Sequence, residues 1–250
     1  MNHSILTTER LTKRYGGLVV TDQVSLDIRD GELHAFIGPN GAGKTTLINQ
    51  LSGELASNEG RVIFAGNDIT SLPIYRRARL GLLRSYQITS LFEDFTVLEN
   101  AVLAAIGAKR HAFRFWRPML ESKDAVAIAE NALDMAGLAM RANASVSELG
   151  YGERRQLELA MALAAQPKFL LLDEPMAGMS VQESAAVTNL LRQLKRRYAI
   201  VLVEHDMEAV FALADRISVL VSGKVLFTGT PDEIRSHPEV KAIYLGEESH

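Results

Sequence analysis

The 250-residue sequence contains no cysteine. This absence excludes a disulfide framework and any thiolate metal site, and it fits a reducing cytosol. Long apolar runs are missing too, because stretches such as 169–172 and 199–203 are far shorter than the roughly 20 residues that cross a bilayer. Residues 1–10 are polar and lack the apolar core of a secretory signal. We therefore expect a protein that reaches a membrane only through a partner.

A strong net charge is also absent. The formal charge is −3 and the sequence pI is near 6.1, so no general electrostatic attraction draws the chain to nucleic acid or anionic lipid. The local basic cluster at 111–117 is the one exception in the sequence. Hydrophobic residues make up 47% and charged residues 23% of the chain, as in ordinary globular proteins. We expect a folded protein that does not bind nucleic acid.

A glycine-rich stretch, GPNGAGKTT at 38–46, fits the pattern G-x-x-x-x-G-K-[ST]. It follows a short apolar strand and precedes a helix predicted to begin at Lys44, which favours a phosphate site over a chance glycine turn. Its glycines let backbone N–H groups converge on phosphate oxygens, and the helix adds its positive end. Lys44 would reach the β- and γ-phosphates, and the Thr45 hydroxyl would ligate Mg²⁺. The residues expected to bind ATP are Gly38, Asn40, Gly41, Gly43, Lys44, Thr45 and Thr46.

Two carboxylates, Asp173 and Glu174, end the apolar segment 169–172. A run that is apolar on both faces is typical of a central parallel strand, and ligands of open α/β sheets bind at the carboxyl ends of such strands. Asp173 would hold Mg²⁺ through water, and Glu174 would orient the attacking water. An acid that caps the next helix is the competing interpretation. His205 follows the apolar segment 200–203 and would contact the γ-phosphate, unless it is an ordinary loop residue.

The hydrophobic patterns predict an α/β protein in several parts. Segments 5–15 and 18–28 alternate like paired antiparallel strands, and β and α segments alternate again after residue 169, which implies a parallel sheet covered on both faces. Between them lies a mostly helical stretch in which Thr96 and Glu99 have the spacing of a capping box. We predict a P-loop NTPase core with a parallel sheet, an N-terminal antiparallel β subdomain and an inserted helical subdomain. The expected boundaries are 1–87 and 166–230 for the core, 88–165 for the helical subdomain and 231–250 for a C-terminal tail.

In this order the motifs resemble the ATP-binding cassette (ABC) family of transporter ATPases along nearly the whole chain. The resemblance implies further roles. Tyr15, within Arg-Tyr-Gly-Gly at 14–17, resembles the residue that stacks on adenine. Gln87 resembles the glutamine that contacts Mg²⁺ or the attacking water and signals to membrane subunits. Glu-His-Asp at 204–206 resembles the histidine switch.

Leu-Gly-Tyr-Gly-Glu at 149–153 stands where the family has its signature motif, which closes over ATP bound to the opposite subunit. The resemblance thus assigns Gly150, Tyr151, Gly152 and Glu153 to a partner's ATP. N–H groups exposed at a helix start would form an anion site without a phosphate loop of its own, so two chains are needed. The family usually has serine in place of Gly150 and often aspartate in place of Ser180. Both departures favour a non-identical ATPase partner, with a homodimer as the competing interpretation.

Segments 14–18, 109–120 and 243–248 resemble the ATPases of branched-chain or hydrophobic amino-acid importers. That resemblance implies a second ATPase chain, two membrane permeases, a secreted binding protein and a place on the cytoplasmic face of the inner membrane. The tail also resembles the lipopolysaccharide-export ATPase, which lacks so long an insert. A soluble ABC protein of DNA repair or ribosomes and a subunit that only binds ATP compete with these two functions. The basic, aromatic insert at 111–116 is either a surface loop or a partner contact.

Overall fold

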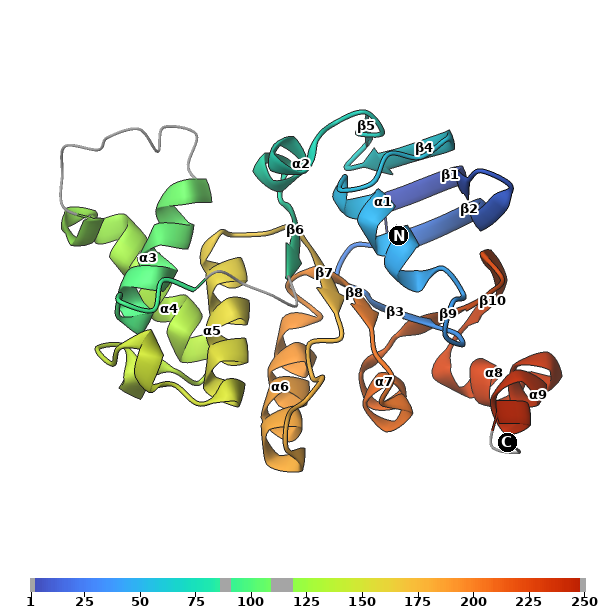
Figure 1. Cartoon of the computed structure of the whole chain (residues 1–250). Helices are drawn as coiled ribbons and strands as arrows, with labels where there is room; N and C mark the ends of the chain where they lie inside the picture. Colours follow the sequence, from blue (N-terminus) through green and yellow to red (C-terminus); the bar gives the residue numbers. More distant parts are fainter. Residues whose placement is uncertain (1–2, 86–90, 109–118, 248–250) are drawn as a thin grey trace.

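The computed structural model describes residues 3–85, 91–108 and 119–247, and a six-stranded sheet forms its centre. The strand order is β10-β9-β3-β8-β7-β6, parallel except for the antiparallel edge strand β10. Figure 1 shows this sheet running through the middle and right of the molecule. Its strands are β3 (Leu33–Ile37), β6 (Leu82–Ser85), β7 (Phe169–Asp173), β8 (Ala199–Val203), β9 (Arg216–Val221) and β10 (Lys224–Gly229).

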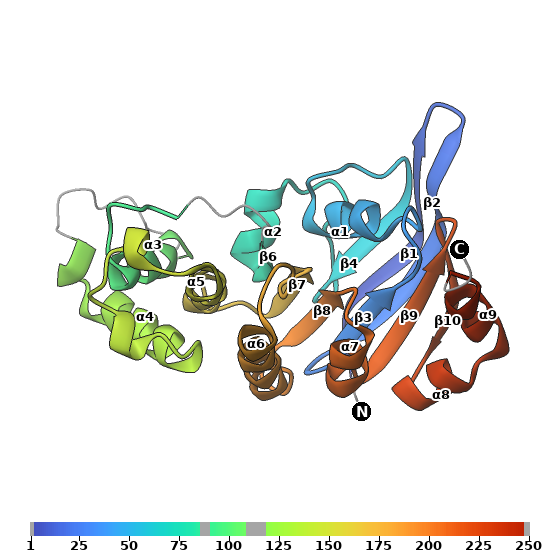
Figure 2. The ribbon, with the colours of Figure 1, turned by 60° about the horizontal axis from the view of Figure 1, so that its bottom comes forward.

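A second, four-stranded antiparallel sheet has the order β2-β1-β4-β5. Its long hairpin, β1 (Ser4–Tyr15) and β2 (Leu18–Arg29), is the antiparallel pair predicted from the sequence. The short strands β4 (Glu59–Phe64) and β5 (Asn67–Asp68) were not predicted. This sheet and helix α1 (Lys44–Ser52) enclose one buried cluster against the central sheet (Figure 2).

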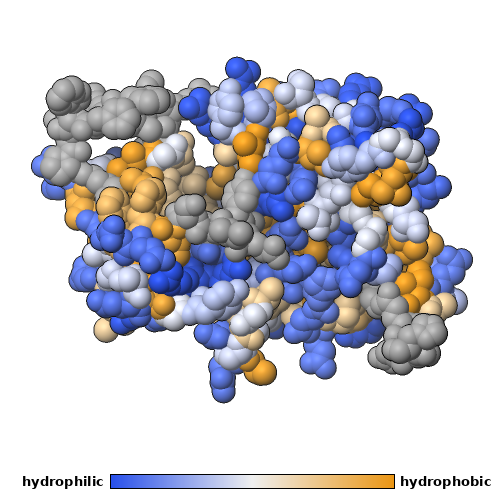
Figure 3. Space-filling view, in the orientation of Figure 1, coloured by the Kyte–Doolittle hydropathy of each residue, from blue (hydrophilic) through white to orange (hydrophobic). Residues whose placement is uncertain are grey.

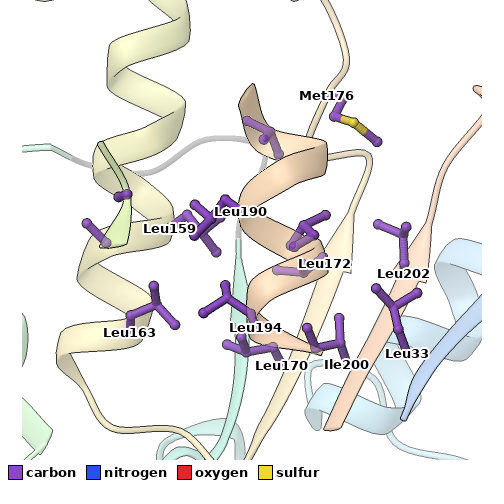
Figure 4. Close-up of a cluster of buried hydrophobic side chains, with 14 of the residues drawn as sticks. Leu33, Leu159, Leu163, Leu170, Leu172, Met176, Leu190, Leu194, Ile200 and Leu202 are labelled. Carbon is purple, nitrogen blue, oxygen red and sulfur yellow. The ribbon is translucent and has the colours of Figure 1, made fainter. Parts of the chain in front are cut away.

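Strand β7 is buried at every residue, and its side chains alternate between two cores. Phe169 and Leu171 join the cluster under α1, whereas Leu170 and Leu172 join the larger cluster on the opposite face. Helices α6 (Val181–Leu194) and α7 (Met207–Leu213) contribute to the larger cluster. Figure 4 shows Leu170 and Leu172 beside α6. Because both faces are covered, an apolar side chain is needed at nearly every position of the strand.

Three helices form a separate group at the left of Figure 1: α3 (Val97–Ala108), α4 (Lys123–Met135) and α5 (Tyr151–Ala164). The predicted capping box opens this group, since Thr96 N–H donates to Glu99 Oε2 at 2.7 Å and Glu99 N–H donates to Thr96 Oγ1 at 3.1 Å. Short 3₁₀ turns, Met119–Glu121, Ala139–Arg141 and Val146–Glu148, connect its helices. The elements agree with the α/β prediction, and the division of the chain at 88 and 165 stays a prediction.

The remaining helices lie beside the central sheet: α2 (Ile74–Leu80), α8 (Pro231–Ser236) and α9 (Pro238–Glu247). Within the described residues, no helix combines the length and the apolar character that a membrane span requires. Figure 3 shows a largely hydrophilic face, with hydrophobic atoms gathered over the helical group at the left and near the sheets at the right.

Candidate active site

The phosphate loop, 38–43, joins β3 to α1 as the sequence predicts. Gly38 has φ +152° and Gly43 has φ +101°, conformations that L side chains rarely adopt. A Cβ atom on Gly38 would collide with the carbonyl oxygen of Leu220 in β9, and one on Gly43 would collide with that of Val20 in β2. Backbone atoms on both sides therefore confine the loop, and only glycine fits at these two positions.

Lys44 begins α1 and points back into the loop. Its Nζ donates to the carbonyl oxygens of Gly38 at 2.6 Å and Pro39 at 3.1 Å, and the residue is only 7% exposed. Thr45 is exposed and Thr46 is half-buried at the positive end of the same helix. Asn40 and Gly41 are exposed at the tip of the loop. The structure thus brings all seven predicted ATP-binding residues together around one helix start.

Asp173 and Glu174 lie at the carboxyl end of β7, next to the end of β8. Glu174 adopts φ +50°, which is uncommon for a residue with a side chain, and its N–H donates to the Val203 carbonyl at 2.8 Å. His205 Nε2 lies 2.8 Å from Glu174 Oε1, at hydrogen-bond distance. Neither acid caps a helix, because α6 begins at Val181 with Ser180 as its cap, so the competing interpretation fails.

Arg84 on β6 pairs with Asp173, a contact that the sequence analysis did not predict. Its guanidinium bonds Asp173 Oδ2 at 2.8 Å, Glu54 Oε2 at 2.7 Å and the side-chain oxygen of Asn49. Asp173 is 8% exposed, and burial raises its pKa while Arg84 opposes that rise. The arginine therefore favours the ionised carboxylate that a cation site needs.

Glu204 joins the two loops that carry Glu174 and His205, and the sequence analysis gave its side chain no role. The residue is 5% exposed. Its Oε1 accepts the Met176 N–H at 2.8 Å, and its Oε2 accepts the His205 N–H at 3.2 Å. Burial raises the pKa of Glu204, and these two backbone bonds oppose the rise. A charged residue directly after the apolar strand β8, in the place that Glu174 holds after β7, is the sequence signal that marks it.

The structure gives less support to the predicted roles of two other residues, Gln87 and Tyr15. Gln87 lies outside the described residues, as do positions 109–118 of the insert. Tyr15 ends β1 with its side chain 53% exposed, and Lys13 Nζ lies 5.2 Å from the ring centroid. An exposed aromatic ring is suited to stacking on a base, and that role stays a prediction.

The signature residues begin helix α5, with Gly150 at its N-cap. Two of their N–H groups, those of Gly150 and Gly152, already have acceptors within this chain, and the predicted contact with a partner's ATP stays a prediction. The Gly150 N–H donates to Glu153 Oε2 at 3.1 Å, so Glu153 caps its own helix. Gly152 is buried against the carboxylate of Glu183 on α6. Tyr151 is exposed, and its hydroxyl donates to the Ala177 carbonyl at 3.0 Å.

Comparisons with known proteins match this arrangement. The family model described as "ABC transporter" matches residues 21–177. The chain belongs to the ABC transporter family, as an ATP-binding cassette. A second model, "Branched-chain amino acid ATP-binding cassette transporter", matches residues 224–250.

Relatives match the cassette over its full length. It is 38% identical over 259 residues to the high-affinity branched-chain amino acid transport ATP-binding protein LivG of Salmonella typhimurium, covering 99% of this chain and 100% of the relative. It is 35% identical to BraF, a protein of the same description from Pseudomonas aeruginosa, with coverage of 99% and 100%.

Solved cassettes share the fold. An ATP-binding cassette of an ABC transporter in its ADP conformation has a TM-score of 0.86 and 29% identity, over 98% of this chain and 99% of that one. A dimeric bacterial ABC transporter cassette has a TM-score of 0.76 and 25% identity, over 90% and 98%. The cassette is thus a nucleotide-binding ATPase with the predicted α/β fold.

Proposed function

We propose that this cassette powers the uptake of branched-chain or other hydrophobic amino acids through partner permeases. The full-length likeness to LivG and BraF and the match at 224–250 support this choice. The same comparisons give no support to lipopolysaccharide export or to a soluble ABC protein. The observation that carries the hydrolytic role is the 2.8 Å contact between Glu174 and His205 beside the phosphate loop, which opposes a subunit that only binds ATP.

In the proposed mechanism the residues of this chain bind and orient ATP and water. N–H groups of the loop 38–43 and the ammonium of Lys44 hold the phosphates, and the low accessibility of Lys44 strengthens its electrostatic effect. Glu174 takes a proton from the attacking water, acting as general base. His205 holds the Glu174 carboxylate and contacts the γ-phosphate. Tyr15 stacks on the adenine.

The residues present suit Mg²⁺. A buried carboxylate at Asp173, whose ionised form Arg84 favours, and an exposed hydroxyl at Thr45 are oxygen ligands, the type that this ion prefers. Within the described ranges no group of three or more His, Cys, Asp or Glu side chains is placed to hold a metal, which fits an ion held largely by phosphates and water. Gln87 would add another oxygen. When bound, the ion would neutralise charge on the phosphates.

The proposed working unit is a dimer of cassettes attached to two permeases at the cytoplasmic face of the inner membrane, supplied by a secreted binding protein. The signature residues 150–153 begin helix α5, and no phosphate loop precedes this helix. This supports a role for them in binding the partner's ATP. Gly150 offers no hydroxyl there. Ser180, where the family often has aspartate, serves as the N-cap of α6. These two departures support a non-identical partner chain.

The proposal is tested by replacing the chromosomal copy with a Glu174→Gln variant. The purified variant should bind MgATP but hydrolyse it at least about tenfold more slowly, because the general base is lost. In the host cell, uptake of labelled leucine, isoleucine and valine should fall to the level of a deletion strain, whereas uptake of a labelled sugar should not change. Near-normal ATP turnover would refute the assignment of Glu174. Normal amino-acid uptake with lost turnover would refute the substrate class.

A further inference from the structure

Helices α5 and α6 begin side by side, so the signature motif touches the loop 176–180 of its own chain. Besides the bond from the Tyr151 hydroxyl to the Ala177 carbonyl, a Cβ on Gly178 would lie 3.3 Å from that hydroxyl and 3.5 Å from the ring. The two helices also share the larger core cluster, in which Leu159 of α5 lies beside Leu190 of α6 (Figure 4). The two helix starts therefore lie close enough for their side chains and backbone to touch.

The carboxylate of Glu183 lies at the junction of these two helix starts. Its Oε2 accepts the N–H of Ser180 at 2.8 Å and the hydroxyl of Ser180 at 2.7 Å, which completes a capping box. Its Oε1 lies against Gly152, where any Cβ atom would collide with it. These bonds lower the pKa of Glu183, those from Ser180 most and that from the Gly152 N–H in addition. Glu183 is therefore an anion that contacts both the signature helix and the loop before α6.

Gly152 shows that this contact shapes the signature motif. It is not among the glycines with positive φ, so its backbone does not require glycine. The three atoms nearest to an added Cβ belong to Glu183: its Oε1, Cδ and Cγ. Glycine inside a helix costs about 0.5–1 kcal/mol relative to alanine, so its presence here calls for a reason. The close approach of the Glu183 carboxylate supplies that reason within this chain.

We infer that the carboxylate of Glu183 is an internal anion bound at the start of the signature helix α5. It thereby sets how strongly that helix start binds the ATP held by the partner. This inference rests on the proposed function, in which the start of α5 faces the partner's γ-phosphate. A carboxylate and a phosphate compete for the same N–H groups at a helix start, and two negative charges there repel each other. Arrival of the γ-phosphate displaces Glu183 from Gly152. Because Glu183 stays bonded to Ser180, its displacement moves the loop 176–180 and reports the occupancy of the partner's site.

The test measures ATP retained by the transporter assembly, purified from host membranes through a tag on this chain. A Glu174→Gln background blocks hydrolysis, and retained labelled ATP is counted after rapid gel filtration over a range of ATP concentrations. Adding Glu183→Gln preserves the size of the side chain and removes its charge. The ATP concentration for half-maximal retention should fall about two- to fivefold, on the scale of charge effects at helix ends.

A matched control is available in α8. Glu233 makes the same capping box with Thr230, where its Oε2 accepts the Thr230 N–H at 2.7 Å and the hydroxyl at 3.0 Å. Glu233→Gln should leave the retention curve unchanged. In a Gly152→Ala background, where the new Cβ already displaces the carboxylate, Glu183→Gln should produce no further shift, a coupling that a purely structural cap would not show.

The outcomes separate this inference from the proposed function. If the Glu174→Gln parent retains no ATP, the closed dimer is refuted and the inference falls with it. If the parent retains ATP but Glu183→Gln leaves the midpoint unchanged, only the inference is wrong. A midpoint that rises would show that Glu183 merely stabilises α6.

Discussion

Glycines stand in both the phosphate loop, 38–43, and the signature loop, 149–153, but different surroundings require them. At Gly38 and Gly43, the obstacles to a side chain are backbone carbonyls of neighbouring strands, and both residues have positive φ. At Gly152 the obstacle is one carboxylate on a rotatable side chain. At Gly150 the nearest atom to an added Cβ is Glu153 Oε2, at 4.0 Å.

The two halves of the proposed composite site are therefore held in place by different means. The loop proposed to hold the chain's own ATP is confined by backbone atoms of the neighbouring strands. The surface proposed to face the partner's ATP is contacted by Glu153 and Glu183, whose side chains can rotate away. We therefore expect substitutions in the phosphate loop to act on folding and binding together, and substitutions in the signature loop to tune closure.

The largest effect is expected from Gly38→Ala. The added Cβ collides with the Leu220 carbonyl, and forcing extra volume into a packed site typically costs about 1–3 kcal/mol, with added strain from φ. ATP affinity should fall at least about tenfold, and the melting temperature should fall as well. Equilibrium binding of a fluorescent ATP analogue and thermal unfolding measure the two quantities.

Gly41→Ala is the matched control for that substitution. Gly41 also has positive φ, +78°, but a Cβ there meets no atom of the described residues within 4 Å. The free energy lost in this variant should be limited to the strain of a left-handed conformation, about 1–2 kcal/mol. If the two variants bind ATP equally well, contact with the neighbouring strands does not shape the loop and the comparison fails.

A smaller effect is expected from Glu204→Gln. Both carboxylate oxygens of Glu204 accept backbone N–H groups, from Met176 and His205. An amide has one oxygen, so one buried N–H loses its acceptor, at a cost of about 1–3 kcal/mol. The loops of Glu174 and His205 should lose their alignment, so kcat should fall about tenfold while the KM for MgATP changes little.

The exposed Glu208, in the first turn of α7, provides the control for that experiment. Glu208→Gln should leave kcat and KM unchanged. Equal losses of kcat, ATP affinity and thermal stability in Glu204→Gln would mean that Glu204 supports the fold generally and does not position the hydrolytic pair.

Local patterns were sufficient to predict most of the fold and of the chain's own site. The apolar run at 169–172 needs a strand covered on both faces, and a carboxylate after such a strand must lie at the sheet edge. The phosphate loop follows from glycine spacing between a strand and a helix. The box at Thr96 and Glu99 predicts a helix start from residues that are neighbours in the sequence.

Contacts between distant segments were not predictable in this way. Arg84 and Asp173 are 89 residues apart, and only the pairing of β6 with β7 brings them together. A lone arginine after two leucines in a short strand was the available signal. Glu183 lies against Gly152 because α5 and α6 begin side by side in the fold. Its capping box with Ser180 is a contact between neighbours in the sequence, but the sequence analysis did not predict it.

A smaller effect than that of Glu204→Gln is expected from Gly150→Ser, which restores the hydroxyl usual in the family. A Cβ fits there, because its nearest neighbour would be 4.0 Å away, and serine is a favoured N-cap. A new hydrogen bond to a charged phosphate is worth at most about 1.5–3 kcal/mol, and solvent at this exposed residue reduces that value. The ATP concentration for half-maximal retention in the Glu174→Gln background should therefore fall about twofold to tenfold. Gly150→Ala, which adds the Cβ without the hydroxyl, should give no such gain. If both variants behave alike, the backbone and Glu183 alone set how strongly the signature residues bind ATP.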